Sequence, residues 1–256
     1  MGQSVTDDLR DISVVIPLRN RGGMRLENCL KSLRWQDADK SNVEVLLSDF
    51  GSDEGFREEL KTLAATFGAR IVRTESKEIW NRARALNIGI RASRSRYILC
   101  TDADMVFAPN FISTLLSAQE GAGDRALVVC RCRDLPESVP ERSQAEESFP
   151  ELLVASTMRE RLGTGACQMA TRDFFEAVRG FDEAYKFWGL EDTDLTHRAQ
   201  LWGLELDWVH EQTAMLHQWH PSDRKKRPIR KMMNDIRFHL TKSRIKKNPR
   251  SWGLMP

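Results

Sequence analysis

The sequence predicts an α/β fold, with a mostly parallel mixed sheet flanked by helices in a single domain that ends in a helical tail. Over the first hundred residues, short apolar runs alternate with longer segments of helical periodicity, which is typical of parallel strands joined by helices. The chain has 256 residues, 41% of them hydrophobic, so it can bury one large core. One apolar run leads straight into two aspartates, which indicates that the strands end at a ligand site.

The first strand is expected within residues 11–20, DISVVIPLRN, because a β-branched run there ends in polar residues. A helix is expected over 22–37, where leucines recur on one face at helical spacing. Residues 42–55, NVEVLLSDFGSDEG, predict a second strand, since an apolar run is followed by a loop of Gly, Ser and Asp.

The alternation continues with a helix over 56–69, a strand over 70–74, a helix over 79–93 and a strand within 96–105. Sheets of this kind bind ligands beyond the carboxyl ends of their strands, so the functional loops are expected at that edge. They are the loops after Pro17, Leu47 and Cys100.

The pattern is less regular in the second half of the chain. Residues 133–152 are rich in Pro, Ser and Glu, and we expect a long mobile loop there. Residues 163–185 predict a turn with glycines, a short strand and a helix that begins at Thr171 or Asp173.

The net charge of +2 is unevenly distributed, because residues 221–256 contain twelve Lys or Arg and only two Asp. A basic tail of this kind can bind phosphates, an anionic polymer or an acidic membrane surface. Residues 229–245 also keep helical periodicity, so we expect an amphipathic helix whose apolar side docks on the body. The apolar side comprises Ile229, Met232, Met233, Ile236 and Leu240.

The sequence has no apolar run of the ~18 to 20 residues that a membrane span needs, and its first residues are polar and acidic. We therefore expect a cytoplasmic protein, peripheral at most to the inner face of the membrane through its basic tail. The five cysteines are scattered and form no CxxC pair, so reduced thiols are expected rather than zinc ligands.

Residues 187–195, FWGLEDTDL, gather Glu191, Asp192 and Asp194 directly after an aromatic pair and a glycine. Like charges this close repel, so the cluster costs stability unless a cation or a substrate uses it. The alternative is the acidic first turn of a helix that ends at Gly203, which the helix dipole would stabilise.

Two further pairs of residues can bind a metal ion. Asp102 and Asp104 leave the end of a predicted strand and can face one hard cation, since oxygen ligands suit Mg²⁺ or Mn²⁺. His217 and His220 lie three apart in MLHQWHP, and imidazoles beside carboxylates favour Mn²⁺. Each pair alone is equally compatible with turn chemistry or with ordinary surface and core histidines. The two signals strengthen each other only if the fold joins them.

Five segments, in this order, resemble motifs of β-1,4-galactosyltransferase-like enzymes and, in diluted form, of bacterial family 2 glycosyltransferases. They are IPLRNR (16–21), WNRARALNIGI (80–90), TDADM (101–105), GTGACQMATRDFFEAVRGFDEAY (163–185) and FWGLEDTDLTHRAQLWG (187–203). The resemblance covers roughly residues 12–223. It implies the GT-A (Rossmann-like) fold, a UDP-sugar donor and a divalent metal, normally Mn²⁺, with Mg²⁺ as the alternative.

The resemblance also implies a division of the chain. A transferase domain would span 1–223, with a nucleotide-binding half at about 12–110 and an acceptor-binding half at about 150–223. A basic helical extension would follow at 224–256.

By the same resemblance, single residues receive roles. Asp192 matches the catalytic base, Glu191 an acceptor contact and Trp188 the aromatic side chain on which a sugar ring packs. Asp194 is left as a structural carboxylate. The residues that match donor contacts are Pro17, Arg19, Arg21, Asp49, Arg82 and Asp102. The residues that match metal ligands are Asp104, His217 and His220.

The predicted activity is a metal-dependent, inverting transfer of a hexose or N-acetylhexosamine from a UDP-sugar to a hydroxyl of a glycan or anionic polymer. Such a transfer needs a carboxylate to take the acceptor proton, a metal to hold the leaving phosphates and an aromatic wall for the sugar. Two alternatives stay open. One is a retaining transferase resembling polypeptide N-acetylgalactosaminyltransferases, and the other is a non-catalytic module that binds a sugar nucleotide or a glycan.

Overall fold

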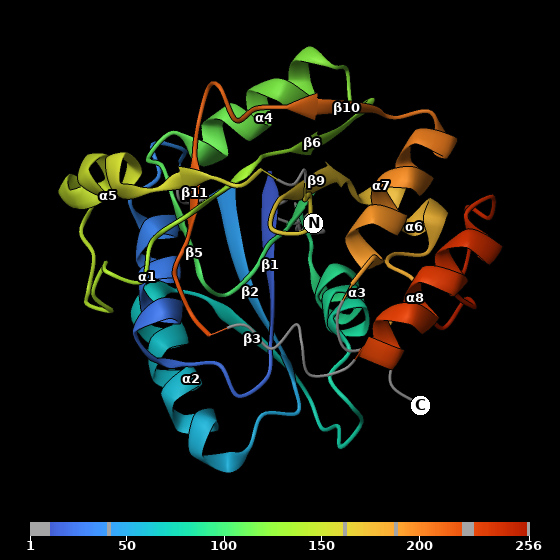
Figure 1. Cartoon of the computed structure of the whole chain (residues 1–256), viewed down its shortest axis with the longest axis horizontal. Coiled ribbons are helices and arrows are strands. Elements are labelled where there is room, and N and C mark those ends of the chain that lie inside the picture. Colours follow the sequence, from blue (N-terminus) through green and yellow to red (C-terminus); the bar gives the residue numbers. More distant parts are fainter. Residues whose placement is uncertain (1–10, 40–41, 161–162, 187–188, 222–227, 255–256) are drawn as a thin grey trace, which may run out of the picture.

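The computed structural model describes residues 11–39, 42–160, 163–186, 189–221 and 228–254. In these residues, a seven-stranded sheet carries helices on both faces (Figure 1). Its strands, in spatial order, are β10 (Glu205–Trp208), β6 (Ala126–Val129), β9 (Gln168–Thr171), β4 (Tyr97–Cys100), β1 (Ile12–Leu18), β2 (Val43–Phe50) and β3 (Arg70–Thr74). Four of the pairs are parallel, and β9 is antiparallel to both of its neighbours. The predicted mostly parallel mixed sheet is confirmed.

The strands are buried because helices cover the sheet on both sides. All seven residues of β1 are buried, and hydrophobic side chains along it alternate between two cores, with Val14 in one and Val15 in the other. The first core includes residues of α1 (Gly23–Arg34), α2 (Glu54–Phe67) and α4 (Phe111–Gly121). The second includes residues of α3 (Arg82–Ala92), α6 (Arg172–Val178) and α7 (Glu191–Trp202). Burial on two sides explains why the strands read as continuous apolar runs.

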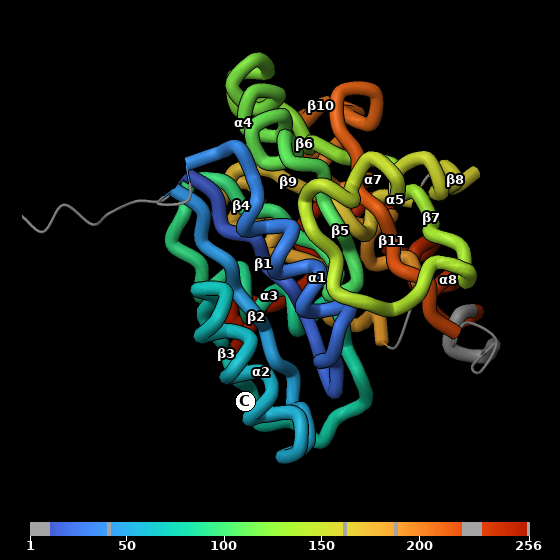
Figure 2. The backbone as a smooth tube through the Cα atoms, turned by 90° about the vertical axis from the view of Figure 1, so that its left-hand side faces the viewer, coloured from blue at the N-terminus to red at the C-terminus, as the bar shows by residue number. Residues whose placement is uncertain are grey.

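A second, smaller sheet follows the end of β4. Its order is β5 (Met105–Phe107), β11 (Met215–His217), β7 (Cys132–Asp134) and β8 (Thr157–Met158). Strand β11 is antiparallel to β5 and parallel to β7, so three distant parts of the sequence meet here. Figure 2 shows these strands to one side of β1, β2 and β3.

The segment at 133–152 contains more structure than the predicted loop. The end of β7, a short 3₁₀ helix (Glu146–Ser148) and the start of α5 (Phe149–Ala155) fall within it. Asn28 of α1 ties its middle to the body, accepting from the Gln144 amide at 2.8 Å and donating to the Arg142 carbonyl at 2.9 Å. The prediction of a loop was therefore partly wrong. Proline also suits the first turn of a helix, as in α5, so a segment rich in proline can contain a helix.

The C-terminal tail contains the predicted helix, α8 (Pro228–Thr241), but the predicted apolar side does not dock on the body. The side chains of Met232, Met233, Ile236 and Leu240 are exposed. The side chain of Ile229 lies outside the part of the structure that is described. The prediction was wrong because helical periodicity identifies an apolar stripe without telling which way the stripe faces.

The residues after α8 return to the body. Trp252 is buried in the second core, and Asn248 donates to the Arg179 carbonyl at 2.7 Å and accepts from the Glu183 amide at 3.0 Å. Among the helices in the described part of the chain, none is both long and apolar enough to cross a membrane.

Candidate active site

Two of the predicted site residues lie in the segment that joins β4 to β5. Asp102 and Asp104 leave the carboxyl end of β4, which is buried along its whole length. The Asp104 carbonyl accepts a hydrogen bond from the Gln218 amide at 3.0 Å, and β11 pairs His217 with Met105. This register brings the MLHQWHP segment directly to the second aspartate.

Asp104, His217 and His220 form a compact cluster. One ligand atom from each lies within 4.8 Å of the others. Nε2 of His220 is 3.2 Å from Asp104 Oδ2, and Nε2 of His217 is 3.8 Å from the same oxygen. The fold therefore joins the two signals that the sequence left separate.

In both imidazoles the nitrogen that faces away from Asp104, Nδ1, lies beside an oxygen atom that can accept a hydrogen bond. Nδ1 of His217 lies 3.1 Å from Asp134 Oδ1, and Asp134 is in turn held by Arg159, whose Nε donates to Oδ2 at 2.8 Å. Nδ1 of His220 lies 3.0 Å from the Pro221 carbonyl. When Nδ1 donates in each ring, Nε2 carries the lone pair, which is the arrangement of metal-bound histidines.

The ionisation of the cluster also fits a cation. Burial alone would raise the pKa of Asp104, but the hydrogen bond with His220 and the nearby positive charges lower it. The same hydrogen bond, in which Nε2 carries a proton, raises the pKa of His220, and a bound metal ion would take the place of that proton. One ionised carboxylate and two imidazoles suit Mn²⁺ and related transition metals better than Mg²⁺, which prefers oxygen ligands. The residues therefore fit a metal of the predicted kind.

Arg82, at the start of α3, connects the aspartate segment with the acidic helix. Its Nε donates to Asp102 Oδ1 at 2.8 Å and one terminal nitrogen donates to the Gly165 carbonyl at 2.6 Å. The other terminal nitrogen lies 3.8 Å from Glu191 Oε1 and is buried without a hydrogen-bond partner. Burial raises the pKa of Asp102 although Arg82 opposes this. A guanidinium held in this way has one unused donor for an anionic ligand.

The acidic cluster begins α7 and divides into three different environments. Glu191 is buried, and its burial, followed by the charge of Asp192, raises its pKa to about 7. Its Oε2 accepts from the Gly189 amide at 3.0 Å. Asp192 is only half-buried and lies against Gly165, where an added Cβ would come within 3.0 Å of Asp192 Oδ2. The absence of a side chain at Gly165 leaves room for this carboxylate.

Asp194 belongs to the core rather than to the site. It has no exposed surface and pairs with Arg198, whose Nε lies 2.8 Å from Oδ2, and with Lys247. The structural role expected for Asp194 is therefore confirmed. Trp188, the expected sugar platform, lies outside the described residues.

The loop after β1 and the end of β2 hold the expected nucleotide contacts. Pro17 is within β1, and Arg19 donates to the Ser76 carbonyl at 3.4 Å and to the Glu78 carbonyl. Arg21 is exposed, and its charge helps to lower the pKa of Asp104.

Asp49 is more enclosed than Arg19 and Arg21. It is buried, accepts from the Ser52 amide at 2.9 Å and forms an ion pair with Arg73. Arg73 also donates to the Ser52 carbonyl at 2.8 Å, so the two side chains shape the loop after β2 together.

Comparison with family models identifies the chain. Residues 13–179 match the model of glycosyl transferase family 2. The chain belongs to glycosyl transferase family 2. A second model, described as the N-terminal domain of galactosyltransferase, matches residues 155–220. The motif series predicted this family.

Curated relatives are distant and longer. Over 224 residues the chain is 25% identical to validoxylamine A glucosyltransferase of Streptomyces hygroscopicus subsp. jinggangensis, covering 76% of this chain and 52% of the relative. It is 33% identical over 118 residues to the uncharacterized glycosyltransferase YfnE of Bacillus subtilis, covering 46% of this chain and 29% of the relative. The family 2 chain thus spans about half the length, or less, of the curated relatives it matches.

Solved glycosyltransferase structures share the fold. The structure of S. aureus TarS 1-349 in complex with UDP superposes with a TM-score of 0.62 at 16% identity, over 82% of this chain and 61% of that one. GalNAc-T7 with UDP, GalNAc and Mn²⁺ gives a TM-score of 0.68 at 16% identity, over 90% and 48% of the two chains. The GT-A fold predicted for this chain is confirmed.

Sequence reasoning missed the residues that surround the predicted ones. Asp134 and Arg159 were not singled out, although Asp134 ends a strand just as Asp102 follows one. Gln168 was also missed, and its side-chain amide donates to the Asp192 carbonyl at 3.0 Å. A strand that ends in aspartate was the signal available for Asp134, whereas Arg159 and Gln168 had none.

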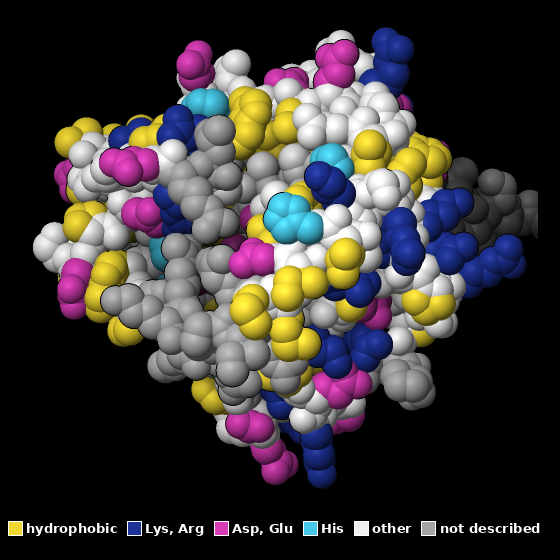
Figure 3. All heavy atoms as spheres, turned by 45° about the vertical axis from the view of Figure 1, so that its right-hand side comes forward, with side chains coloured by type: hydrophobic (Ala, Val, Ile, Leu, Met, Phe, Trp, Pro, Cys, Tyr) yellow, Lys and Arg dark blue, Asp and Glu magenta, His cyan; other side chains and the backbone are white. Residues whose placement is uncertain are grey.

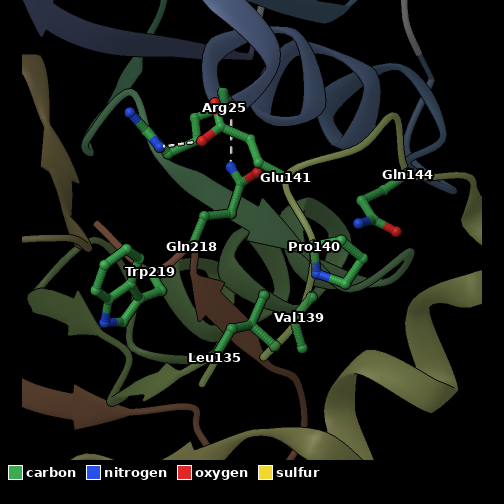
Figure 4. Close-up of a pocket in the computed structure, with 8 residues that line it drawn as sticks. All are labelled: Arg25, Leu135, Val139, Pro140, Glu141, Gln144, Gln218 and Trp219. Atoms are coloured by element: carbon green, nitrogen blue, oxygen red, sulfur yellow. Dashed lines mark hydrogen bonds and ion pairs between the residues drawn. The ribbon is translucent and has the colours of Figure 1, made fainter. Parts of the chain in front are cut away.

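A small hollow next to β11 is lined by side chains that hold the segment with His217 and His220 in place (Figure 4). Gln218 points into it, donating to the Arg25 carbonyl at 2.9 Å and accepting from Asn28 at 2.9 Å. Arg25 is in turn paired with Glu141. Because Gln218 lies between the two histidines in the sequence, these contacts with α1 fix the backbone of the candidate metal site.

Proposed function

We propose that this glycosyltransferase moves a hexose or N-acetylhexosamine from a UDP-sugar to a hydroxyl of a glycan or anionic polymer, with metal dependence and inversion at the anomeric carbon. The observation that supports this most directly is the convergence of Asp104, His217 and His220 on one point. Arg82 links the aspartate segment of that cluster to the start of α7, where Asp192 lies. In this arrangement, a donor phosphate bound at Asp104, His217 and His220 and an acceptor hydroxyl at Asp192 would lie close to each other.

The donor is proposed to lie along the carboxyl ends of β1, β2 and β4. The residues proposed to contact it are Pro17, Arg19, Arg21, Asp49, Arg82 and Asp102. Arg82 has the unused buried donor that a diphosphate oxygen would accept. Two fold neighbours, TarS and GalNAc-T7, were crystallised with UDP, which supports a uridine nucleotide here. We accordingly assign residues 12–110 to the donor and 150–223 to the acceptor, with 224–256 as an extension.

Mn²⁺ is the metal we propose for Asp104, His217 and His220. GalNAc-T7 and a mannosyltransferase from Pyrobaculum calidifontis were crystallised with Mn²⁺, and the donor set of this chain fits that ion. When bound, such an ion offsets the negative charge of a departing diphosphate. The chain's own contribution is to hold three ligand atoms together and to keep both imidazoles oriented through Asp134 and Pro221.

Asp192 is proposed to take the proton from the acceptor hydroxyl while the hydroxyl oxygen attacks the anomeric carbon. The bond between that carbon and the diphosphate oxygen breaks on the opposite side, so configuration inverts and UDP leaves. Glu191 and Trp188 are proposed to position the acceptor sugar. Asp192 is only partly buried, so the hydroxyl group of an acceptor could approach its carboxylate.

The proposal is tested by thermal unfolding with a panel of UDP-sugars, with and without Mn²⁺. A ligand that binds only the folded state at a hundredfold excess over its Kd adds about 2.7 kcal/mol, so the right donor stands out when the metal is present. The anomeric configuration of the product with that donor, read by NMR, separates inversion from retention. If neither UDP nor any UDP-sugar raises the unfolding temperature with Mn²⁺, the proposed donor class is wrong.

A further inference from the structure

Helix α8 presents an apolar stripe to solvent. Met232, Met233, Ile236 and Leu240 are 56%, 54%, 51% and 75% exposed, and their spacing places them on one side of the helix. We call these four side chains the α8 stripe. Figure 3 shows hydrophobic side chains gathered on this face of the molecule, with lysine and arginine side chains close by. Contiguous exposed apolar patches mark interaction surfaces, whereas single exposed apolar side chains are normal.

The other side of α8 is fixed to the body by polar and aromatic contacts. Arg237 donates to both carboxylate oxygens of Asp182, at 2.7 and 2.8 Å, and Phe238 packs edge-on against His197 at 5.9 Å between ring centroids. Asn234 donates to the Gly189 carbonyl at 3.1 Å. Turning the stripe inward would break the Arg237 pair and bury an unpaired carboxylate, since Asp182 is 1% exposed in this pair. The outward orientation is therefore the stable one.

Positive charge continues directly from the stripe. The three basic residues Lys242, Arg244 and Lys246 follow α8 and are exposed. Two other basic residues are already in ion pairs, Lys247 with Asp194 and Arg237 with Asp182. An apolar helix face bordered by exposed lysine and arginine is the pattern of helices that lie in the interface of an anionic bilayer. We propose that the α8 stripe inserts into the surface of a membrane containing anionic lipids, with Lys242, Arg244 and Lys246 at the headgroups.

A second copy of the chain fits this surface less well. In a twofold contact that packs the two α8 helices parallel, the two sets of Lys242, Arg244 and Lys246 would lie close together, and like charges in an interface are unfavourable. Four side chains also form a small contact compared with the ~800 Å² per partner of a typical stable interface. An anionic surface, in contrast, neutralises the charges and covers the stripe.

The position of α8 gives this docking a consequence for the acceptor, which rests on the proposed glycosyl transfer. Asn234 is bonded to the Gly189 carbonyl, and the Gly189 amide donates to Glu191 at the start of α7. Docking through α8 therefore holds the acceptor side of the site near the bilayer. An acceptor attached to a lipid, or a polymer growing at the membrane, would be reached there.

Vesicle sedimentation tests the docking without any sugar. The full chain is mixed with sucrose-loaded vesicles of phosphatidylcholine alone or of phosphatidylcholine with phosphatidylglycerol, and the bound fraction is measured over a range of lipid concentrations. We expect binding to the anionic vesicles that weakens with added salt, and weak or no binding to the neutral ones. The combined substitution Met233→Gln, Ile236→Gln and Leu240→Gln should weaken binding by at least ~10-fold, because it removes the apolar insertion.

Two controls make the result specific. Val154→Gln removes an 88% exposed apolar side chain on α5 and should leave binding unchanged. Lys242→Gln with Lys246→Gln should weaken binding to anionic vesicles by about fivefold for each lysine and leave thermal unfolding unaltered. A wild-type chain that stays in the supernatant with anionic vesicles overturns the proposal, as does a triple variant that binds like the wild type. Stripe-dependent dimers in light scattering without vesicle binding would instead identify a copy-to-copy interface. None of these outcomes depends on sugar transfer.

Discussion

Nδ1 of His217 lies 3.1 Å from Oδ1 of Asp134, the residue that the pairing of β11 with β7 places directly beside it. The carboxylate fixes the tautomer that leaves Nε2 facing Asp104. We therefore expect Asp134→Asn to weaken Mn²⁺ binding by about 10- to 100-fold, the range found when a partner of a metal-bound histidine is lost. Isothermal titration of the chain with Mn²⁺ measures this directly. Asp173→Asn, at an exposed position on α6, is the matched control, and equal affinities in the two variants would contradict the role of Asp134.

The histidines themselves should have larger effects on metal affinity than Asp134. His217→Ala or His220→Ala removes a ligand atom that lies within 4.8 Å of the other two, so Mn²⁺ binding should weaken and activity should require more metal. The same titration, followed by activity against Mn²⁺ concentration, tests each residue separately. A variant that titrates like the wild type excludes that histidine as a ligand.

Asp192→Asn should separate binding from chemistry. The proposed donor contacts lie on other elements, so the metal-dependent affinity for UDP is expected to stay normal. Transfer should fall by about 10² to 10⁴, the usual contribution of a general base. Equilibrium binding of UDP and turnover with the identified donor are measured on the same preparation. Near-normal turnover would remove Asp192 from the mechanism.

Burial of Glu191 should make the stability of the chain depend on pH. Its pKa is raised from 4.5 to about 7, mainly by burial, so the folded state binds a proton more tightly than the unfolded state. The stabilisation from that proton is fully present below pH 4.5 and is lost as the pH rises through about 7. The shift corresponds to about 3 kcal/mol across this window.

The substitution Glu191→Gln removes this titration and preserves an acceptor for the Gly189 amide. We expect the variant to gain stability relative to the wild type as the pH rises from 5 to 8, in urea unfolding without metal. If the difference between the free energies of unfolding of the two proteins stays constant from pH 5 to 8, Glu191 does not titrate in this range. The measurement is independent of transfer activity.

The sequence was most informative where local pattern decides structure. Alternating strands and helices predicted β1 to β4 and α1 to α3, because their apolar periodicity reflects burial between two helical layers. The grouping of Asp104, His217 and His220 could be anticipated from the resemblance, but only the register of β11 brings His217 beside Met105 and Asp134. Register depends on pairing between distant segments, which no local pattern contains.

Orientation was the other feature that the sequence left undetermined. The stripe on α8 has the periodicity of a docking face, yet Arg237 and Phe238 hold the helix by its opposite side. Likewise, counting charges gave every lysine of the tail the same weight, although the side chain of Lys247 is 1% exposed and Lys246 is exposed. Tertiary partners such as Asp182 and Asp194 decide these cases, and they lie far away in the chain.

The adjacent lysines Lys246 and Lys247 provide the last prediction. Lys247 and Asp194 form an ion pair in which the two side chains are 1% and 0% exposed, and Arg198 shares the same carboxylate. Removing one partner of a buried pair leaves uncompensated charge, so Lys247→Gln should lower the free energy of unfolding by about 3 kcal/mol. Lys246→Gln changes an exposed charge and should alter it by less than about 0.5 kcal/mol. Urea unfolding of both variants at one pH measures the difference. Equal stabilities would mean that Arg198 alone satisfies Asp194 and that the tail is not anchored through Lys247.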